Sequence, residues 1–145
     1  MRMRHHTVRG GILLGLAVGT AIWVWLFAVD AIAGEPLRTF SLLGGVARFT
    51  VLHYALCCVY GVIGVAVVHG AAREASLLIG AVVAFILFEL AFVFGTAVLA
   101  QVGLGQLAWV RIMGGNVVGA IVTWTVLART HPLRDELRQA GEEDA

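Results

Sequence analysis

Long apolar runs alternate with short polar links along the chain. Each run holds 20 or more residues, about the length that a helix needs to cross a bilayer. In lipid a helix satisfies its own backbone hydrogen bonds, which an open strand cannot do. The pattern therefore predicts an all-α, polytopic integral membrane protein in which four transmembrane helices form a bundle. The predicted spans are about 11–33, 49–68, 75–99 and 107–128.

The composition supports the same class of protein. Hydrophobic residues make up 60% of the chain, whereas soluble domains average about 45–50%. Four spans nearly exhaust 145 residues, so we expect a single transmembrane domain over 1–145 and a short cytoplasmic tail over 129–145. The net charge of +1 gives no sign of nucleic-acid binding.

All basic residues are arginine, and most of them fall on one side of the predicted bundle. Basic residues favour the cytoplasmic side of membrane proteins. Both termini are therefore predicted to be cytoplasmic, in what we expect to be a bacterial inner (cytoplasmic) membrane. The cytoplasmic set is Arg2, Arg4, Arg9, Arg73, Arg129, Arg134 and Arg138, and the opposite set is Arg38, Arg48 and Arg111.

The N-terminal run has an alternative interpretation as a secretory signal. Arginines precede it, and the small-residue triplet Ala31-Ile32-Ala33 follows it. The apolar core of a signal peptide spans about 7–15 residues, and the run from Ile12 to Val29 is longer. A retained transmembrane helix is the preferred prediction, with cleavage as the alternative.

The link between the first two runs changes from polar to apolar along its length. Pro36 lies near its start and the Gly44-Gly45 pair at its end. Such residues mark turns. We predict a short surface helix or re-entrant turn between them, lying along the membrane interface.

Glycines recur every fourth residue in two of the predicted helices. Residues four apart share one helix face, and glycine there lets two backbones approach closely. These faces are predicted contact surfaces within the bundle, or alternatively within a homo-oligomer or larger assembly. They consist of Gly11, Gly15 and Gly19 in the first helix and Gly115 and Gly119 in the last.

A few polar residues interrupt the apolar runs, and Glu89 lies deepest. At 1.5 Å per residue, Glu89 and Asn116 lie about 15 Å and about 13 Å from the non-cytoplasmic ends of their helices. Charged residues at such depth usually face a partner or a water-filled cavity. Asp30, His53 and Arg111 lie nearer the same surface. Together these five predict a polar intramembrane site that opens away from the cytoplasm.

A purely structural interpretation uses the same residues. Asp30 and Arg111 would form an interfacial salt bridge capped by His53. Glu89 would be neutral and hydrogen-bonded to Asn116, because burial raises the pKa of a carboxyl group.

Metal binding is a further alternative, because His53 and Cys57 are four residues apart on one helix face. Such ligands suit Cu(I) or Zn(II), but one histidine and one thiol form only half a site. Haem ligation by His53 and His69 is disfavoured, since 16 residues separate them by about 24 Å along one helix. The sequence specifies no cofactor.

No constellation of catalytic residues is evident, and almost no mass lies outside the predicted membrane segments. The sequence therefore favours a small accessory or assembly subunit, or scaffold, of a larger membrane complex over an enzyme. Its expected partners are membrane lipids and other membrane protein subunits or further copies of itself. A small ion, proton or small-molecule transporter or channel is the alternative, and a metal-binding or redox membrane protein is the third.

The predicted topology can be tested with reporter fusions. Fusions after Ala72 and after Ala145 should report a cytoplasmic location, and a fusion after Pro36 an external one, because of the arginine distribution. Paired alkaline phosphatase and fluorescent-protein reporters measure this. An external C-terminus would invert the predicted orientation.

Overall fold

The computed structural model describes residues 2–71, 76–99, 101 and 109–130; part of the α4 side chains, Glu89 among them, lies outside this description. Every element in these ranges is helical. The predicted tail from residue 131 onward lies outside the described residues. The elements are α1 (Arg2–Ile32), α2 (Arg38–Leu42), α3 (Val46–Ala71), α4 (Ser76–Leu99), the π-helical turn η2 (Trp109–Met113) and α5 (Gly114–Thr130).

Three described helices are long and apolar enough to cross a membrane. They are Thr7–Ile32, Val46–Gly70 and Trp109–Thr130, and they coincide with three of the four predicted spans. These helices give the chain the character of an integral membrane protein. The 24-residue α4 occupies the remaining predicted run, and its membrane crossing stays a prediction.

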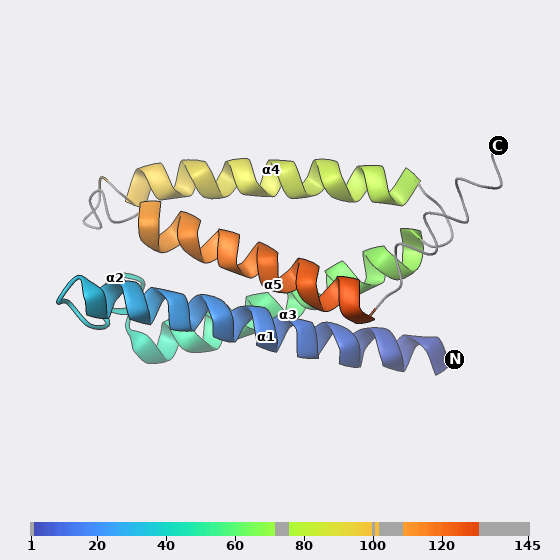
Figure 1. Cartoon of the computed structure of the whole chain (residues 1–145), viewed down its shortest axis with the longest axis horizontal. Helices are drawn as coiled ribbons and strands as arrows, with labels where there is room; N and C mark the ends of the chain where they lie inside the picture. Colours follow the sequence, from blue (N-terminus) through green and yellow to red (C-terminus); the bar gives the residue numbers. More distant parts are fainter. Residues whose placement is uncertain (1, 72–75, 100, 102–108, 131–145) are drawn as a thin grey trace.

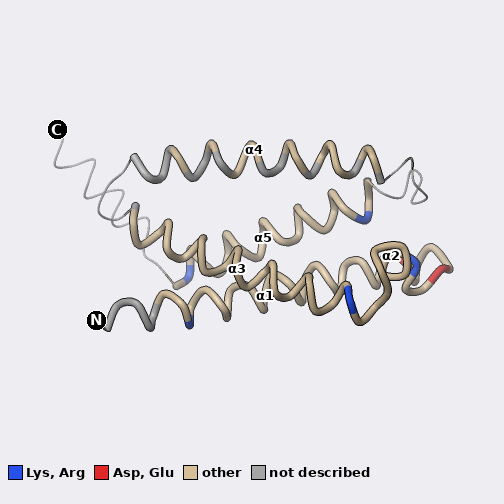
Figure 2. Tube along the Cα trace, turned by 180° about the vertical axis from the view of Figure 1, so that it is seen from behind, with Lys and Arg blue, Asp and Glu red and all other residues tan. Residues whose placement is uncertain are grey.

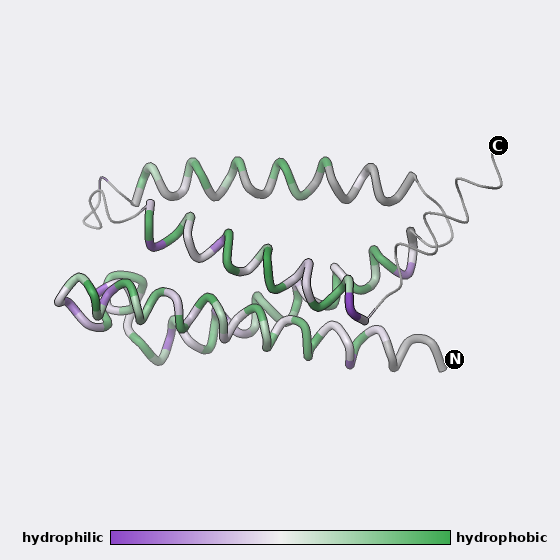
Figure 3. The backbone as a smooth tube through the Cα atoms, viewed as in Figure 1, coloured by the Kyte–Doolittle hydropathy of each residue, from purple (hydrophilic) through white to green (hydrophobic). Residues whose placement is uncertain are grey.

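The long helices run up and down between two ends of the molecule (Figure 1). One end, called the Arg9 end here, holds the beginnings of α1 and α4 and the ends of α3 and α5. The other, called the Asp30 end, holds the opposite ends of these helices together with α2 and η2. Among the residues that are coloured in the figures, charged ones lie near the two ends of the bundle (Figure 2), and hydrophobic ones predominate between the ends (Figure 3).

The backbones of α1 and α3 touch where glycines face them. A Cβ atom added at Gly61 would lie 2.6 Å from the Gly15 nitrogen, and one added at Gly15 would lie 2.5 Å from the Cα atom of Cys58. A Cβ atom at Gly11 would lie 2.7 Å from the nitrogen of Val62. Ordinary van der Waals contact begins at 3.4 Å, so no side chain fits there. Close backbone packing of this kind drives helix association in lipid.

The other periodic glycines face side chains instead. A Cβ atom at Gly19 would lie 3.1 Å from the Tyr54 ring, and one at Gly119 would lie 2.9 Å from Ile22 Cδ1. Gly115 also faces Ile22. Gly115 and Gly119 let α5 pack against α1 over the buried core, whereas Gly19 leaves room for the Tyr54 ring of α3. That core consists of Leu14, Val18 and Val65, with Ile22, Val122, Val126 and Leu127 packed around them.

The short helix α2 lies between Pro36 and the glycine pair, where the sequence predicted either a short surface helix or a re-entrant turn. Gly44 and Gly45, with φ values of +102° and +91°, turn the chain from α2 into α3, a conformation that glycine adopts without strain. Phe40 of α2 is fully buried. Its ring contacts Trp23 of α1 and Phe49 of α3, with centroid distances of 4.9 and 5.1 Å. Aromatic packing therefore holds α2 to both long helices.

The helix α4 lies apart from this core, on the far side of α5 from α1 (Figure 1). Its main contacts are with α3 and with η2, which meet it at opposite ends of the bundle. Its described side chains include exposed apolar groups such as Leu87 and Phe94, which are 61% and 73% exposed. The α1, α3 and α5 helices thus form a packed core, whereas the described side chains of α4 are mostly exposed.

The glycine contact between α1 and α3 predicts different effects of one substitution at two neighbouring positions. Gly61→Ala should lower the free energy of unfolding by about 1–3 kcal/mol, because the added methyl group overpacks a backbone contact. Gly64→Ala is the matched control, since its nearest neighbour would be a Leu14 side-chain atom at 3.9 Å. Reversible unfolding in mixed detergent micelles measures both. Equal stability of the two variants would contradict the close approach.

Candidate functional site

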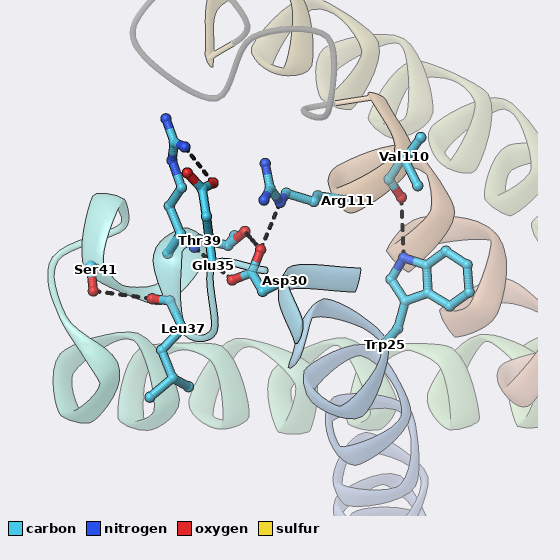
Figure 4. A network of polar contacts seen from close by, with 9 residues as sticks. Trp25, Asp30, Glu35, Leu37, Thr39, Ser41, Val110 and Arg111 are labelled. Atoms are coloured by element: carbon cyan, nitrogen blue, oxygen red, sulfur yellow. Dashed lines mark hydrogen bonds and ion pairs between the residues drawn. The ribbon is translucent and has the colours of Figure 1, made fainter. Parts of the chain in front are cut away.

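A buried ion pair joins three segments at the Asp30 end (Figure 4). Arg111 of η2 donates from Nε to Asp30 Oδ1 over 2.6 Å. Thr39 of α2 donates to the same carboxylate twice, from its hydroxyl to Oδ1 and from its backbone N–H to Oδ2, both over 2.7 Å. All three residues have 0% exposure. Burial makes these bonds to charged groups strong, and it makes the loss of any partner costly.

Local backbone geometry brings Thr39 to Asp30. The carboxylate lies in the last turn of α1, and the chain then reverses so that the first turn of α2 meets it. Leu37, just before α2, has the left-handed values φ 66° and ψ 13° and makes no side-chain capping bond. Asp30 instead accepts the N–H of Thr39, an early α2 amide that has no partner within the helix. The Asp30 carboxylate of α1 therefore acts as an N-terminal cap of α2.

The π-helical turn η2 positions Arg111 through a second contact with α1. Trp25 donates its indole N–H to the Val110 carbonyl oxygen over 3.1 Å. A Cβ atom on Gly114 would lie 2.5 Å from the Trp25 ring, so the absence of a side chain there lets the indole lie against the start of α5. π-Helical turns are rare and are often found at functional sites. Here the turn and the indole fix the residue beside Val110, which is Arg111.

A second ion pair lies beside the first but is exposed. Arg38 donates to Glu35, and both side chains are 43% exposed. Figure 4 shows Glu35 of this pair at the same end of the bundle as Arg111. The hydrogen bond from Arg38 lowers the pKa of Glu35, and the positive charges of Arg38 and Arg111 act in the same direction. The pair is therefore intact at neutral pH and is lost as the pH falls through the lowered pKa.

Two buried nitrogen atoms in the described part of the chain have no hydrogen-bond partner. They are Nη2 of Arg111 and Nδ2 of Asn116. Both are donors, so an acceptor is what each one lacks. The predicted partner of Asn116 was Glu89, which lies in α4 with its side chain outside the described residues. That pairing stays a prediction.

His53 bonds to the backbone of α1 and not to the Asp30–Arg111 ion pair. The prediction that His53 caps this ion pair is therefore wrong. Its Nε2 lies 3.0 Å from the Gly19 carbonyl oxygen of α1, and its ring stacks on Phe49 with a centroid distance of 5.1 Å. A carbonyl oxygen only accepts, so Nε2 carries a proton. The ring packs α3 against α1 instead of reaching the Asp30 carboxylate.

The proposed metal ligands are close to each other. Cys57 Sγ lies 3.9 Å from Nδ1 and 3.8 Å from Nε2 of His53. Within the described ranges, no group of three or more His, Cys, Asp or Glu side chains could hold a metal ion. The contact between His53 and Cys57 lies at the α1–α3 interface.

An apolar groove of about 740 Å³ lies along α1. It extends from Leu16 to Ala28 and reaches Val118 of α5. Its two polar side chains already have partners, because Thr20 bonds to the Tyr54 hydroxyl at 2.9 Å and Trp25 to Val110. The predicted polar residues lie outside its lining. This groove is therefore apolar and does not form the predicted polar site.

The ion pair can be tested by a double-mutant cycle. Arg111→Met alone should lower the free energy of unfolding by about 3–5 kcal/mol, because it leaves a buried carboxylate unpaired. Adding Asp30→Asn removes that charge and keeps an acceptor for Thr39, so the double variant should lose less than the sum of the singles by about 0.5–3 kcal/mol. Arg48→Met, at an exposed position in α3, is the control and should change little. Additive losses would show that the pair is not coupled.

The structure brings together Asp30 and Arg111, while His53 and Asn116 lie apart from them on α3 and α5. Thr39, Trp25 and Gly61 are important contacts that sequence reasoning missed. The sequence signal for Thr39 was a hydroxyl side chain between Pro36 and the Gly44-Gly45 pair. Gly61 carried no comparable signal, because no other glycine lies four residues away from it.

Comparison with protein-family models, with curated proteins and with solved structures finds no match to this chain.

Proposed function

We propose that this chain is a small accessory or assembly subunit of a larger membrane complex, in a bacterial inner membrane. In this proposal α4 is the fourth span, both termini are cytoplasmic, and the partners are other membrane subunits or further copies of the chain. The observation that carries the proposal is the contrast between the packed core and α4, which offers an uncovered apolar surface.

The uncovered surface of α4 forms a continuous stripe. Val83, Leu87, Leu90 and Phe94 follow a spacing of four, three and four residues, and all four are more than half exposed. Residues at this spacing share one helix face. In lipid, apolar exposure alone does not demand a partner, but side-chain packing does contribute to helix association. Because the main contacts of α4 are with α3 and η2 near its two ends, the middle of α4 can pack against another protein.

The carboxylate of Glu89 adds a second reason. Glu89 lies near the middle of α4, and an ionisable residue at that depth needs a polar partner or a water-filled cavity. An acceptor or donor from a neighbouring subunit would meet this need. The core helices supply the rigid part, because α2 and η2 are fastened to α1 through Asp30.

Transport is the second candidate, favoured by one observation. The Nδ2 atom of Asn116 is buried and unpaired among the described residues, as expected of a group that meets a passing ion or solute. The ion pair itself argues for structure, since Asp30 already accepts three hydrogen bonds. A transport site would therefore consist of Asn116 and Glu89.

Site-directed photo-crosslinking combined with affinity purification tests the subunit proposal. A photoreactive residue at Phe94 of α4 should form an adduct with the membrane protein that copurifies with the tagged chain from native membranes. The same residue at Leu56 of α3 is the control, because that position is 69% exposed, similar to Phe94, but lies on the core. Leu56 should yield lipid adducts only.

Three other outcomes are informative. An adduct with a second copy would assign the surface to a homo-oligomer. Lipid adducts alone at Phe94, with no copurifying protein, would contradict the subunit proposal. Ion flux in proteoliposomes that Glu89→Gln abolishes, without loss of fold, would favour transport, because an amide cannot exchange the proton or carry the charge.

A further inference from the structure

We propose that Arg111, together with Arg38, forms a binding site for a phosphate group at the Asp30 end of the bundle. The phosphate is either that of a phospholipid headgroup or a free inorganic phosphate. This site is independent of the α4 surface and of the proposed subunit role.

The first step in the argument is the count of donors on Arg111. A guanidinium has five N–H bonds, and the one on Nε goes to Asp30. Nη2 carries two more and is buried without an acceptor in the described part of the chain. Asp30 accepts the Nε proton of Arg111 and two bonds from Thr39, but neither of its oxygens bonds to Nη2. A buried cationic donor left unpaired is unfavourable, so this site calls for an acceptor.

The second step is the charge at this end of the molecule. The segments from Asp30 to Arg48 and from Leu99 to Arg111 contain three arginines and two carboxylates. Asp30 pairs with Arg111 and Glu35 pairs with Arg38, so the remaining positive charge is that of Arg48. When Glu35 leaves Arg38, two guanidinium groups share one carboxylate, and an anion would restore the charge balance.

The third step is depth. Asp30 lies two residues before the end of the first described span, and Arg111 lies two residues after the start of the last. Trp109, which is 42% exposed, lies in the same π-helical turn, and tryptophan is enriched at the level of lipid headgroups. Phospholipid phosphates occupy this level, and inorganic phosphate reaches it from water.

The fourth step is the position of Glu35, which is the internal competitor. Its carboxylate bonds to Arg38 in an exposed pair. Glu35 lies at the same end of the bundle as Arg111 (Figure 4), near enough for the positive charge of Arg111 to act on it. A phosphate that replaces this carboxylate would accept from both arginines. Its several acceptor oxygens suit two guanidinium groups, which bind phosphate in forked geometry.

The test measures phosphate binding to the full chain in detergent, with inorganic phosphate as the probe at constant ionic strength. Glu35→Gln should strengthen binding severalfold, because it removes the competing carboxylate and keeps the shape. Arg38→Gln should weaken it, and Arg111→Lys, which keeps a charge for Asp30 but lacks Nη2, should weaken it about tenfold or more. Arg48→Gln is the matched control at another exposed arginine of this end and should change binding less than about twofold.

Native mass spectrometry then separates the two sources. Retention of dioleoylphosphatidylglycerol is compared with retention of a glycolipid that has the same acyl chains and no phosphate. Preferential retention of the phospholipid that depends on Arg38 and Arg111 supports a headgroup site; inorganic phosphate binding alone with the same dependence supports a free anion.

Glu35 as the natural acceptor of Nη2 is the competing explanation. In that case Glu35→Gln would lower thermal stability and leave phosphate binding unchanged, and the proposal would be overturned. It would also be overturned if Arg38→Gln and Arg48→Gln had equal effects. Both comparisons use exposed side chains, so they remain valid if Arg111→Lys fails to fold.

Discussion

The buried carboxylate of Asp30 is the constraint on which the Asp30 end of the structure depends. A charge enclosed in a low-dielectric environment must collect donors, and it collects them from α2 and from η2. Those bonds fix where the chain re-enters the bundle after each of two connections. The aromatic contacts of Phe40 with α1 and α3 then follow, because α2 can reach them only when Asp30 holds its first turn.

A second constraint is the contact between the α1 and α3 backbones. Membrane helices associate through close packing and interhelical hydrogen bonds, and the glycines of both helices allow the close packing. The consequence is a division of the molecule. The core helices are held by backbone contacts and buried polar bonds, whereas α4 depends mainly on contacts at its ends. This division is the basis of the proposed subunit role.

The polar residues fall into two groups, those with hydrogen-bond partners in the described structure and those with an unpaired donor. Asp30 has its bonds to α2 and η2, and His53 has its bond to α1. The donors left over, on Arg111 and Asn116, lie at the edge and in the interior of the last span. Each indicates a missing acceptor, and their different depths call for different partners. An anion fits the first, and a neighbouring helix or passing solute fits the second.

The sequence by itself determined the helical membrane class, three spans and the short helix after Pro36. Hydrophobic length and turn residues are local properties that need no knowledge of neighbours. The depth of a residue in the membrane could also be predicted from its distance to the helix end, which is why Asp30 and Arg111 were expected near the same membrane surface. Only the tertiary structure decided which groups meet. Helices that are apolar all round carry little information about rotation around their own axes. The partners Thr39 for Asp30, the Gly19 backbone for His53, and Gly61 for Gly15 depend on that rotation and on how the connections fold back.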